Sequence, residues 1–228
     1  MLWFLDWTWL LLIPGIILAI WARSYVTKTY NKYVKVPASS GATGGRFAAV
    51  MLRQNGVENV SVVPCQGTLS DHFNPRNNTV SLSEDVYSRP SVASVAIAAH
   101  ECGHVLQHKD GYVPVKIRTA MVPVVSVISN LCFPLLFIGI IAAYTPIIAI
   151  AAWIYFGICM FQVVTLPVEL NASSRALSNI KASGVLTGDE VKGAEKMLKA
   201  AAMTYIASLV VTLLQVWQQF ISHPPIRC

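Results

Sequence analysis

Four long apolar stretches alternate with polar segments along the chain, at residues 2–22, 122–144, 146–166 and 201–221. Each approaches the roughly 20 residues that an α-helix needs to cross a hydrocarbon core of about 30 Å. The first stretch carries aromatic residues near both of its ends, as membrane–water interfaces favour. These are Trp3, Trp7, Trp9, Trp21 and Tyr25. The sequence therefore predicts a polytopic membrane protein with about four transmembrane helices.

A cleavable signal peptide is the alternative interpretation of the first stretch. A signal peptide carries its basic residues before the apolar core, whereas Arg23, Lys28 and Lys32 follow the core here. The order of charges favours an uncleaved anchor over residues 1–22.

Shorter signals in the polar segments predict a small α+β element. Thr43 is a plausible N-cap for a helix that runs to about Gln54. Residues 59–63 and 79–83 have strand-like β-branched content, with proline, glycine and asparagine turns between them. A helix over residues 91–107 follows, with Ser88 as its cap candidate. The expected fold is mainly α-helical, with a small sheet beside that helix.

Composition supports the membrane assignment, because 54% of the 228 residues are hydrophobic and only 12% are charged, against about 25% in average soluble domains. This composition excludes disorder, a coiled coil and a nucleic-acid scaffold, despite the net charge of +6. The five cysteines contain no C-x-x-C pair, so they indicate neither a disulfide framework nor a cysteine zinc site.

The basic residues predict the orientation, because lysine and arginine are retained on the cytoplasmic side of a membrane. Segment 23–121 holds 11 of them and segment 167–200 holds 5, so 16 of the 17 lie between the predicted spans and only Arg227 lies elsewhere. The predicted N-terminus is outside. The chain then divides into an anchor (1–22), a cytoplasmic segment (23–121), a two-helix hairpin (122–166), a second cytoplasmic segment (167–200) and a last helix with its tail (201–228).

A metal-binding motif lies on the predicted helix 91–107. His100-Glu101-Cys102-Gly103-His104 has the H-E-x-x-H pattern, in which residues four apart share a helix face and both imidazoles can bind one Zn²⁺. Zinc lowers the pKa of a bound water to about 7, and Glu101 can take its proton and pass it to a leaving amine. Two half-buried histidines beside a solvated glutamate are the alternative. Gly103, which opens space beside the helix, weighs against it.

Two histidines do not complete a metal site, so a third ligand is needed. His108 continues the spacing, but eight residues separate it from His100, which is roughly 12 Å along a helix. We interpret it as a cation at the helix C-terminus. Glu169 is the only acidic residue between Asp110 and Asp189, and the predicted topology returns it to the same membrane face as the motif. Glu169 is the candidate third ligand, although it can also serve as a charge at a helix N-terminus.

Six further stretches match a known family. They are residues 67–75 (GTLSDHFNP), 80–87 (VSLSEDVY), 98–104 (AAHECGH), 111–114 (GYVP), 164–177 (VTLPVELNASSRAL) and 200–205 (AAAMTY). With these stretches the chain resembles the YugP-like family of bacterial membrane zinc metallopeptidases. The resemblance implies one zinc ion per chain at His100, His104 and Glu169, with Glu101 as base, in the manner of glutamate-zincins.

One position departs from the wider relatives, which place an aspartate four residues after the glutamate, where it orients a zinc histidine. Ser173 stands there in this chain, so either Asn171 or another group orients the histidine, or the histidine is held less firmly and the metal affinity is weaker. Arg175 can bind a substrate carboxylate or pair with an acidic neighbour. His72 can donate to an oxyanion, or it can be a turn histidine paired with Asp71. By analogy with zincins, strand 79–83 can pair with an extended substrate.

These observations predict a zinc endopeptidase of the cell membrane, acting on a peptide or protein at the cytoplasmic face. The bilayer is a partner, a membrane protein or a second copy can be another, and nucleic acid is not expected. An intramembrane protease, with residues 91–107 as a span, would divide the basic residues eight to nine and is disfavoured. A scaffold with a structural or vestigial zinc site is the second hypothesis, but a structural site would not need Glu101.

Overall fold

A computed structural model describes residues 10–142 and 144–222, which form two compact units. Unit 1 contains the described residues of segments 1–23, 116–167 and 204–228. Unit 2 contains segments 24–115 and 168–203. The expected five-segment division of the chain stays a prediction.

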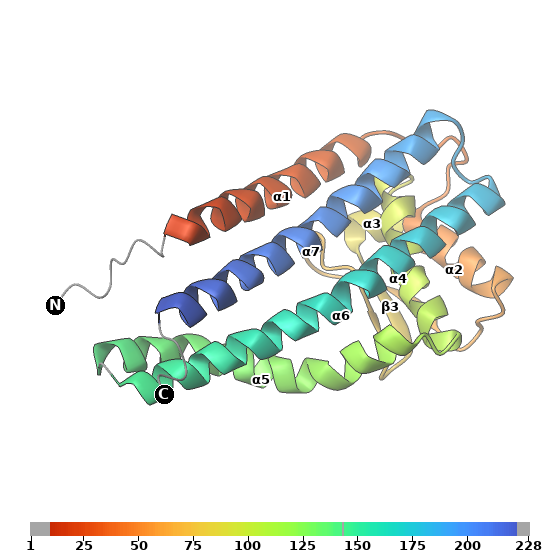
Figure 1. The fold of residues 1–228 in the computed structure, drawn as a ribbon. Coiled ribbons are helices and arrows are strands. Elements are labelled where there is room, and N and C mark those ends of the chain that lie inside the picture. The colour runs from red at the N-terminus through yellow and green to blue at the C-terminus, as the bar shows by residue number, and fades with distance from the viewer. Residues whose placement is uncertain (1–9, 143, 223–228) are drawn as a thin grey trace. The chain divides into compact units, whose positions relative to one another are not determined.

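The described chain is mainly helical (Figure 1). The helices are α1 (Leu12–Tyr33), α2 (Gly44–Gln54), α3 (Glu84–Ser88), α4 (Val92–Lys109), α5 (Val113–Ile141), α6 (Thr145–Ser183) and α7 (Asp189–Ser222). The strands are β1 (Ser61–Cys65), β2 (His72–Asn74) and β3 (Thr79–Ser83). The predicted small α+β element is therefore present, and all three strands belong to unit 2.

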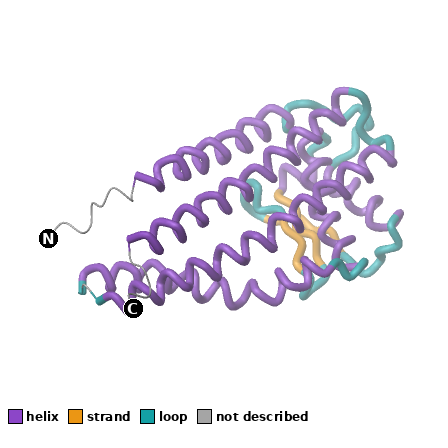
Figure 2. Tube along the Cα trace, in the orientation of Figure 1, coloured by secondary structure: helices purple, strands orange, loops and turns teal. Residues whose placement is uncertain are grey.

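The three strands, orange in Figure 2, form one mixed sheet. Their order is β1-β3-β2. β1 is parallel to β3, and β2 is antiparallel to it. The strand over residues 79–83 is confirmed, whereas the first strand begins two residues later than predicted and β2 was taken for a turn. Because β3 is the central strand and pairs on both sides, the expectation that it offers its edge to a substrate is wrong.

The N-caps of α2 and α4 are both side chains that accept a hydrogen bond, but only the first is the predicted residue. Thr43 caps α2 as predicted, since its side chain accepts a hydrogen bond from the Arg46 N–H at 3.2 Å. Ser88 does not cap α4. It is the last residue of α3, and its hydroxyl donates to the Glu84 carbonyl at 2.6 Å. The N-cap of α4 is Ser91, which accepts from the Ser94 N–H at 3.1 Å.

Helix α4 lies in the core of unit 2 and packs beside α2 and α3. Alanines at positions 93, 96, 98 and 99 are fully buried, and such small side chains let neighbouring backbones approach closely. A Cβ atom on Gly44 of α2 would lie 2.8 Å from the Ser94 carbonyl oxygen. The metal motif is therefore carried by a helix that protein surrounds closely.

Unit 1 contains the apolar parts of the long helices. Among the described residues, three helices are long and apolar enough to cross a membrane, namely Val113–Gly139, Pro146–Ser183 and Asp189–Gln219. Helix α4 is not one of them, as expected. Of the predicted first span, residues 1–9 lie outside the described part of the chain, so the predicted number of four spans is not confirmed.

Candidate metal centre

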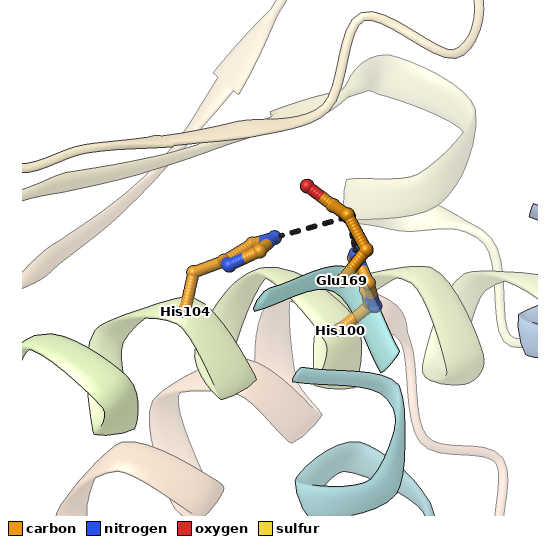
Figure 3. Close-up of side chains that lie close together, drawn as sticks. All are labelled: His100, His104 and Glu169. Carbon is orange, nitrogen blue, oxygen red and sulfur yellow. Dashed lines mark hydrogen bonds and ion pairs between the residues drawn. The ribbon is translucent and has the colours of Figure 1, made fainter. Parts of the chain in front are cut away.

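Two histidines and one glutamate of unit 2 converge at a single point (Figure 3). His100 and His104 lie on α4, and Glu169 lies on α6. One ligand atom from each lies within 4.8 Å of the others. The Nε2 atoms of His100 and His104 are 3.2 Å and 3.6 Å from the same Oε2 atom of Glu169. Two imidazoles and a carboxylate are a donor set that zinc prefers, so this cluster could bind a metal.

The four-residue spacing on α4 determines the arrangement of the two rings. One helical turn separates the histidines, so they emerge on one face. Their ring centroids are 4.8 Å apart and the ring planes are inclined at 83°. Both rings direct Nε2 toward the glutamate, which leaves each Nδ1 atom for a second partner within unit 2.

Gly103 allows α6 to approach α4 at the level of the cluster. A Cβ atom at this position would lie 2.5 Å from the Ala172 carbonyl oxygen of α6, well inside contact distance. Ala172 and Val168 are fully buried at the crossing. The space beside Gly103 that the sequence predicts is therefore filled by the backbone of α6, which brings Glu169 within reach of the histidines.

Glu169 lies inside a long helix, since α6 runs through Pro167 from Thr145 to Ser183. Its interpretation as a charge at a helix N-terminus is therefore wrong, because an interior residue is far from the helix end. The side chain is 2% exposed. A carboxylate buried to this degree needs a positive or hydrogen-bonding partner, and the two imidazoles provide one.

Each histidine has a different partner at Nδ1. The Ser173 hydroxyl lies 3.2 Å from Nδ1 of His100, so serine contacts the histidine from the position where wider relatives have aspartate. The Oε1 atom of Gln107 lies 3.0 Å from Nδ1 of His104. Gln107 was not among the predicted site residues, because a single glutamine on a helix carries no chemical signal until its partners are known.

Asn171 and Arg175 lie one step further from the cluster. Asn171 accepts hydrogen bonds from Gln107 Nε2 at 3.0 Å and from Arg175 Nε at 2.8 Å. Arg175 also donates from Nη1 to the Asp110 carboxylate at 2.5 Å. Here Arg175 pairs with an acidic neighbour, and Asn171 contacts Gln107 rather than the histidine that it was expected to orient.

His72 and Asp71 do not pair as expected. The Asp71 carboxylate accepts hydrogen bonds from the Ser83 N–H at 2.8 Å and from the Ser83 hydroxyl. His72 is exposed on β2, with its Nδ1 atom 2.8 Å from the Ser70 carbonyl oxygen. Burial raises the pKa of Asp71, and the nearby Glu101 carboxylate adds to that rise against the opposing hydrogen bonds from Ser83. Helix α4, which carries the motif glutamate, packs beside β2 and β3.

Three other residues of α4 near the cluster are Glu101, Cys102 and His108. Glu101 is 8% exposed. Cys102 is fully buried with its Sγ atom 3.8 Å from the Ala48 carbonyl oxygen. Burial raises the pKa of that thiol, so Cys102 is a packing residue rather than a thiolate ligand. His108 lies in the last turn of α4, and its ring centroid is 5.5 Å from that of Phe73 on β2.

Comparisons with known proteins identify one family model and one curated relative. The model of the family described as "Putative neutral zinc metallopeptidase" matches residues 8–223. A curated protein of Bacillus subtilis (strain 168), described as "Putative membrane protease YugP", is 40% identical over 206 residues, which are 90% of this chain and 91% of the relative. No solved structure matches the chain at a significant level.

Proposed function

The chain belongs to the neutral zinc metallopeptidase family whose model it matches, and from that premise we propose that it is a membrane-embedded zinc endopeptidase with His100, His104 and Glu169 as metal ligands. The observation that carries the proposal is the convergence of these three side chains within 4.8 Å, although Glu169 is more than 60 residues from either histidine in the sequence. The family implies zinc, and the donor set of the cluster fits that ion.

The reaction assigns a separate task to each residue around the cluster. Zinc, when bound, supplies a Lewis acid and a water of lowered pKa. Glu101 follows His100 on α4 and takes the proton of the attacking water, then delivers it to the leaving nitrogen of the peptide. Because Glu101 is only 8% exposed, its proton is held away from bulk water between the two steps. Ser173 and Gln107 hold the ligand rings.

An extended substrate is proposed to lie along β2 rather than β3. β2 pairs with β3 on one side only, and it packs beside α4. Its outer edge offers backbone groups for strand addition. His72 lies on this strand with an exposed side chain, which supports its proposed role as a donor to the oxyanion of the scissile carbonyl.

The cytoplasmic face is the proposed side of action. Eleven basic residues of segment 23–121 and five of segment 167–200 account for 16 of the 17 in the chain, and both segments contribute to unit 2. Retention of these charges places them in the cytoplasm. The curated relative is itself described as a membrane protease.

Glu101→Gln in the full-length protein, reconstituted in lipid vesicles with zinc, tests the proposal. Cleavage of a mixed peptide library should fall by about 10²- to 10⁴-fold, because the variant lacks the proton acceptor, while the zinc content stays at the wild-type level. Glu58→Gln changes an exposed glutamate of unit 2 in the same way and should leave cleavage unchanged. A Glu101→Gln variant that keeps its full cellular activity would contradict the peptidase proposal and favour a scaffold.

A further inference from the structure

Gln107 is fully buried and connects His104 to helix α6. Its Oε1 atom lies 3.0 Å from His104 Nδ1. Its Nε2 atom donates to the Val168 carbonyl oxygen at 2.7 Å and to Asn171 Oδ1 at 3.0 Å. A primary amide has two N–H groups, and these two contacts use both of them.

The direction of each hydrogen bond around Gln107 can be assigned, because two groups at its ends are fixed in character. One can only donate a hydrogen bond, and the other can only accept one. Arg175 is only a donor, so the Asn171 atom that faces its Nε at 2.8 Å must be the amide oxygen. The Val168 carbonyl is only an acceptor, so the Gln107 atom that faces it must be the amide nitrogen. Gln107 therefore presents its oxygen to His104, and the ring must donate from Nδ1.

We infer that Gln107 is a positioning residue, which fixes the hydrogen of His104 on Nδ1 and leaves Nε2 as the electron-pair donor for the metal. The inference rests on the proposed zinc site and adds a residue outside the H-E-x-x-H motif to it. Arg175 and Asn171 hold the amide of Gln107 in one orientation. The Asp110 carboxylate, which pairs with Arg175 at the protein surface, holds the arginine.

His100 lacks a partner of this kind, because a hydroxyl can rotate. Ser173 Oγ lies 3.2 Å from His100 Nδ1 and can either donate or accept a hydrogen bond. Serine at this position therefore does not determine which ring nitrogen carries the hydrogen. The Gln107 amide does determine it for His104, because both of its N–H groups are already used and only its oxygen is left to face the ring. His104 is therefore the ligand whose protonated ring nitrogen is fixed.

Zn²⁺ affinity and the Co²⁺ absorption spectrum of the full-length protein in detergent test the inference. Gln107→Met keeps a similar size and cannot accept from His104, so zinc should bind about 10- to 100-fold more weakly. Gln107→Glu, the variant closest in shape, should shift the Co²⁺ spectrum because a carboxylate is a stronger acceptor for the imidazole N–H.

The matched control is Asn179→Ala, which removes a hydrogen bond of 2.8 Å that Asn55, the C-cap residue of α2, donates to Asn179 of α6, away from the cluster. This variant loses a polar contact of unit 2 but should keep the wild-type zinc affinity and cobalt spectrum. Wild-type affinity and spectrum in a folded Gln107→Met or Gln107→Glu protein would overturn the inference and leave the proposed function intact. Wild-type protein that binds neither Zn²⁺ nor Co²⁺ would overturn both.

Discussion

Helix α4 of unit 2 and helix α5 of unit 1 are both apolar, but they have different surroundings. In α4, 14 of the 18 residues are buried by protein. In α5, large apolar side chains face outward, with Val124 60% and Val127 61% exposed. An apolar helix belongs either in a protein core or in a membrane. Helix α4 is in the core of unit 2, and α5 is long and apolar enough to cross a membrane.

The two helices differ in the size of their side chains as well as in hydropathy. Alanine, serine and glycine make up 6 of the 14 buried residues of α4, where backbones approach closely. Valine, isoleucine, leucine and phenylalanine dominate α5, where lipid can accommodate bulk. We therefore expect chemistry and metal binding to depend on the packing of unit 2, and membrane insertion to depend on the surface of unit 1.

A pair of valine-to-lysine variants should give the largest contrast between the two units. Val127→Lys places a charge on the outward face of α5 and should cost about 2.5–3.5 kcal/mol of insertion free energy, as measured for basic residues at the centre of a membrane helix. Val50→Lys, at a valine of unit 2 that is 43% exposed, should change stability by less than about 0.5 kcal/mol. The measurement is the fraction of full-length protein that resists alkaline extraction from membranes. Equal extraction of both variants would mean that lipid does not surround α5.

A pair of glycine-to-alanine variants should give a smaller contrast, in stability and metal content. A Cβ atom on Gly103 would meet the Ala172 carbonyl oxygen at 2.5 Å, whereas one on Gly157 of unit 1 would have its nearest neighbour at 4.0 Å. Gly103→Ala should lower unfolding stability by about 1–3 kcal/mol through overpacking and should reduce bound zinc. Gly157→Ala should be neutral, or stabilising by up to about 1 kcal/mol.

Thermal unfolding in detergent and zinc content per chain measure these effects. If Gly103→Ala is as stable as wild type and holds as much zinc, the close crossing of α4 and α6 does not position Glu169. If Gly157→Ala is the more damaging variant, then unit 1 depends on tight packing as much as unit 2 does.

Much of the fold was accessible from sequence because its signals are local. Long apolar runs, the Thr43 cap and the four-residue spacing of His100 and His104 depend only on neighbouring residues. Ser91 and Ser88 show the limit, since both are plausible caps and tertiary packing of α3 decides between them. β2 is only three residues long, and its identity as a strand depends on its partner β3 rather than on its own composition.

The candidate site shows the same division between local and distant information. The motif on α4 is visible in the sequence, and Glu169 follows from counting acidic residues and from the family resemblance. The sequence does not predict Gln107 as a site residue, because an isolated glutamine on a helix carries no chemical signal. Its importance comes from Val168 and Asn171 on α6, whose proximity only the folded chain reveals.

Metal content per chain, determined by mass spectrometry of gently purified full-length protein, tests the central claim most directly. Wild type should contain about one zinc ion per chain, since two imidazoles and one carboxylate form a complete protein ligand set. Glu169→Ala should be depleted of zinc, and Glu84→Ala, an exposed glutamate of unit 2, should match wild type. Wild-type protein without metal, or a Glu169→Ala variant with a full complement of zinc, would contradict the account.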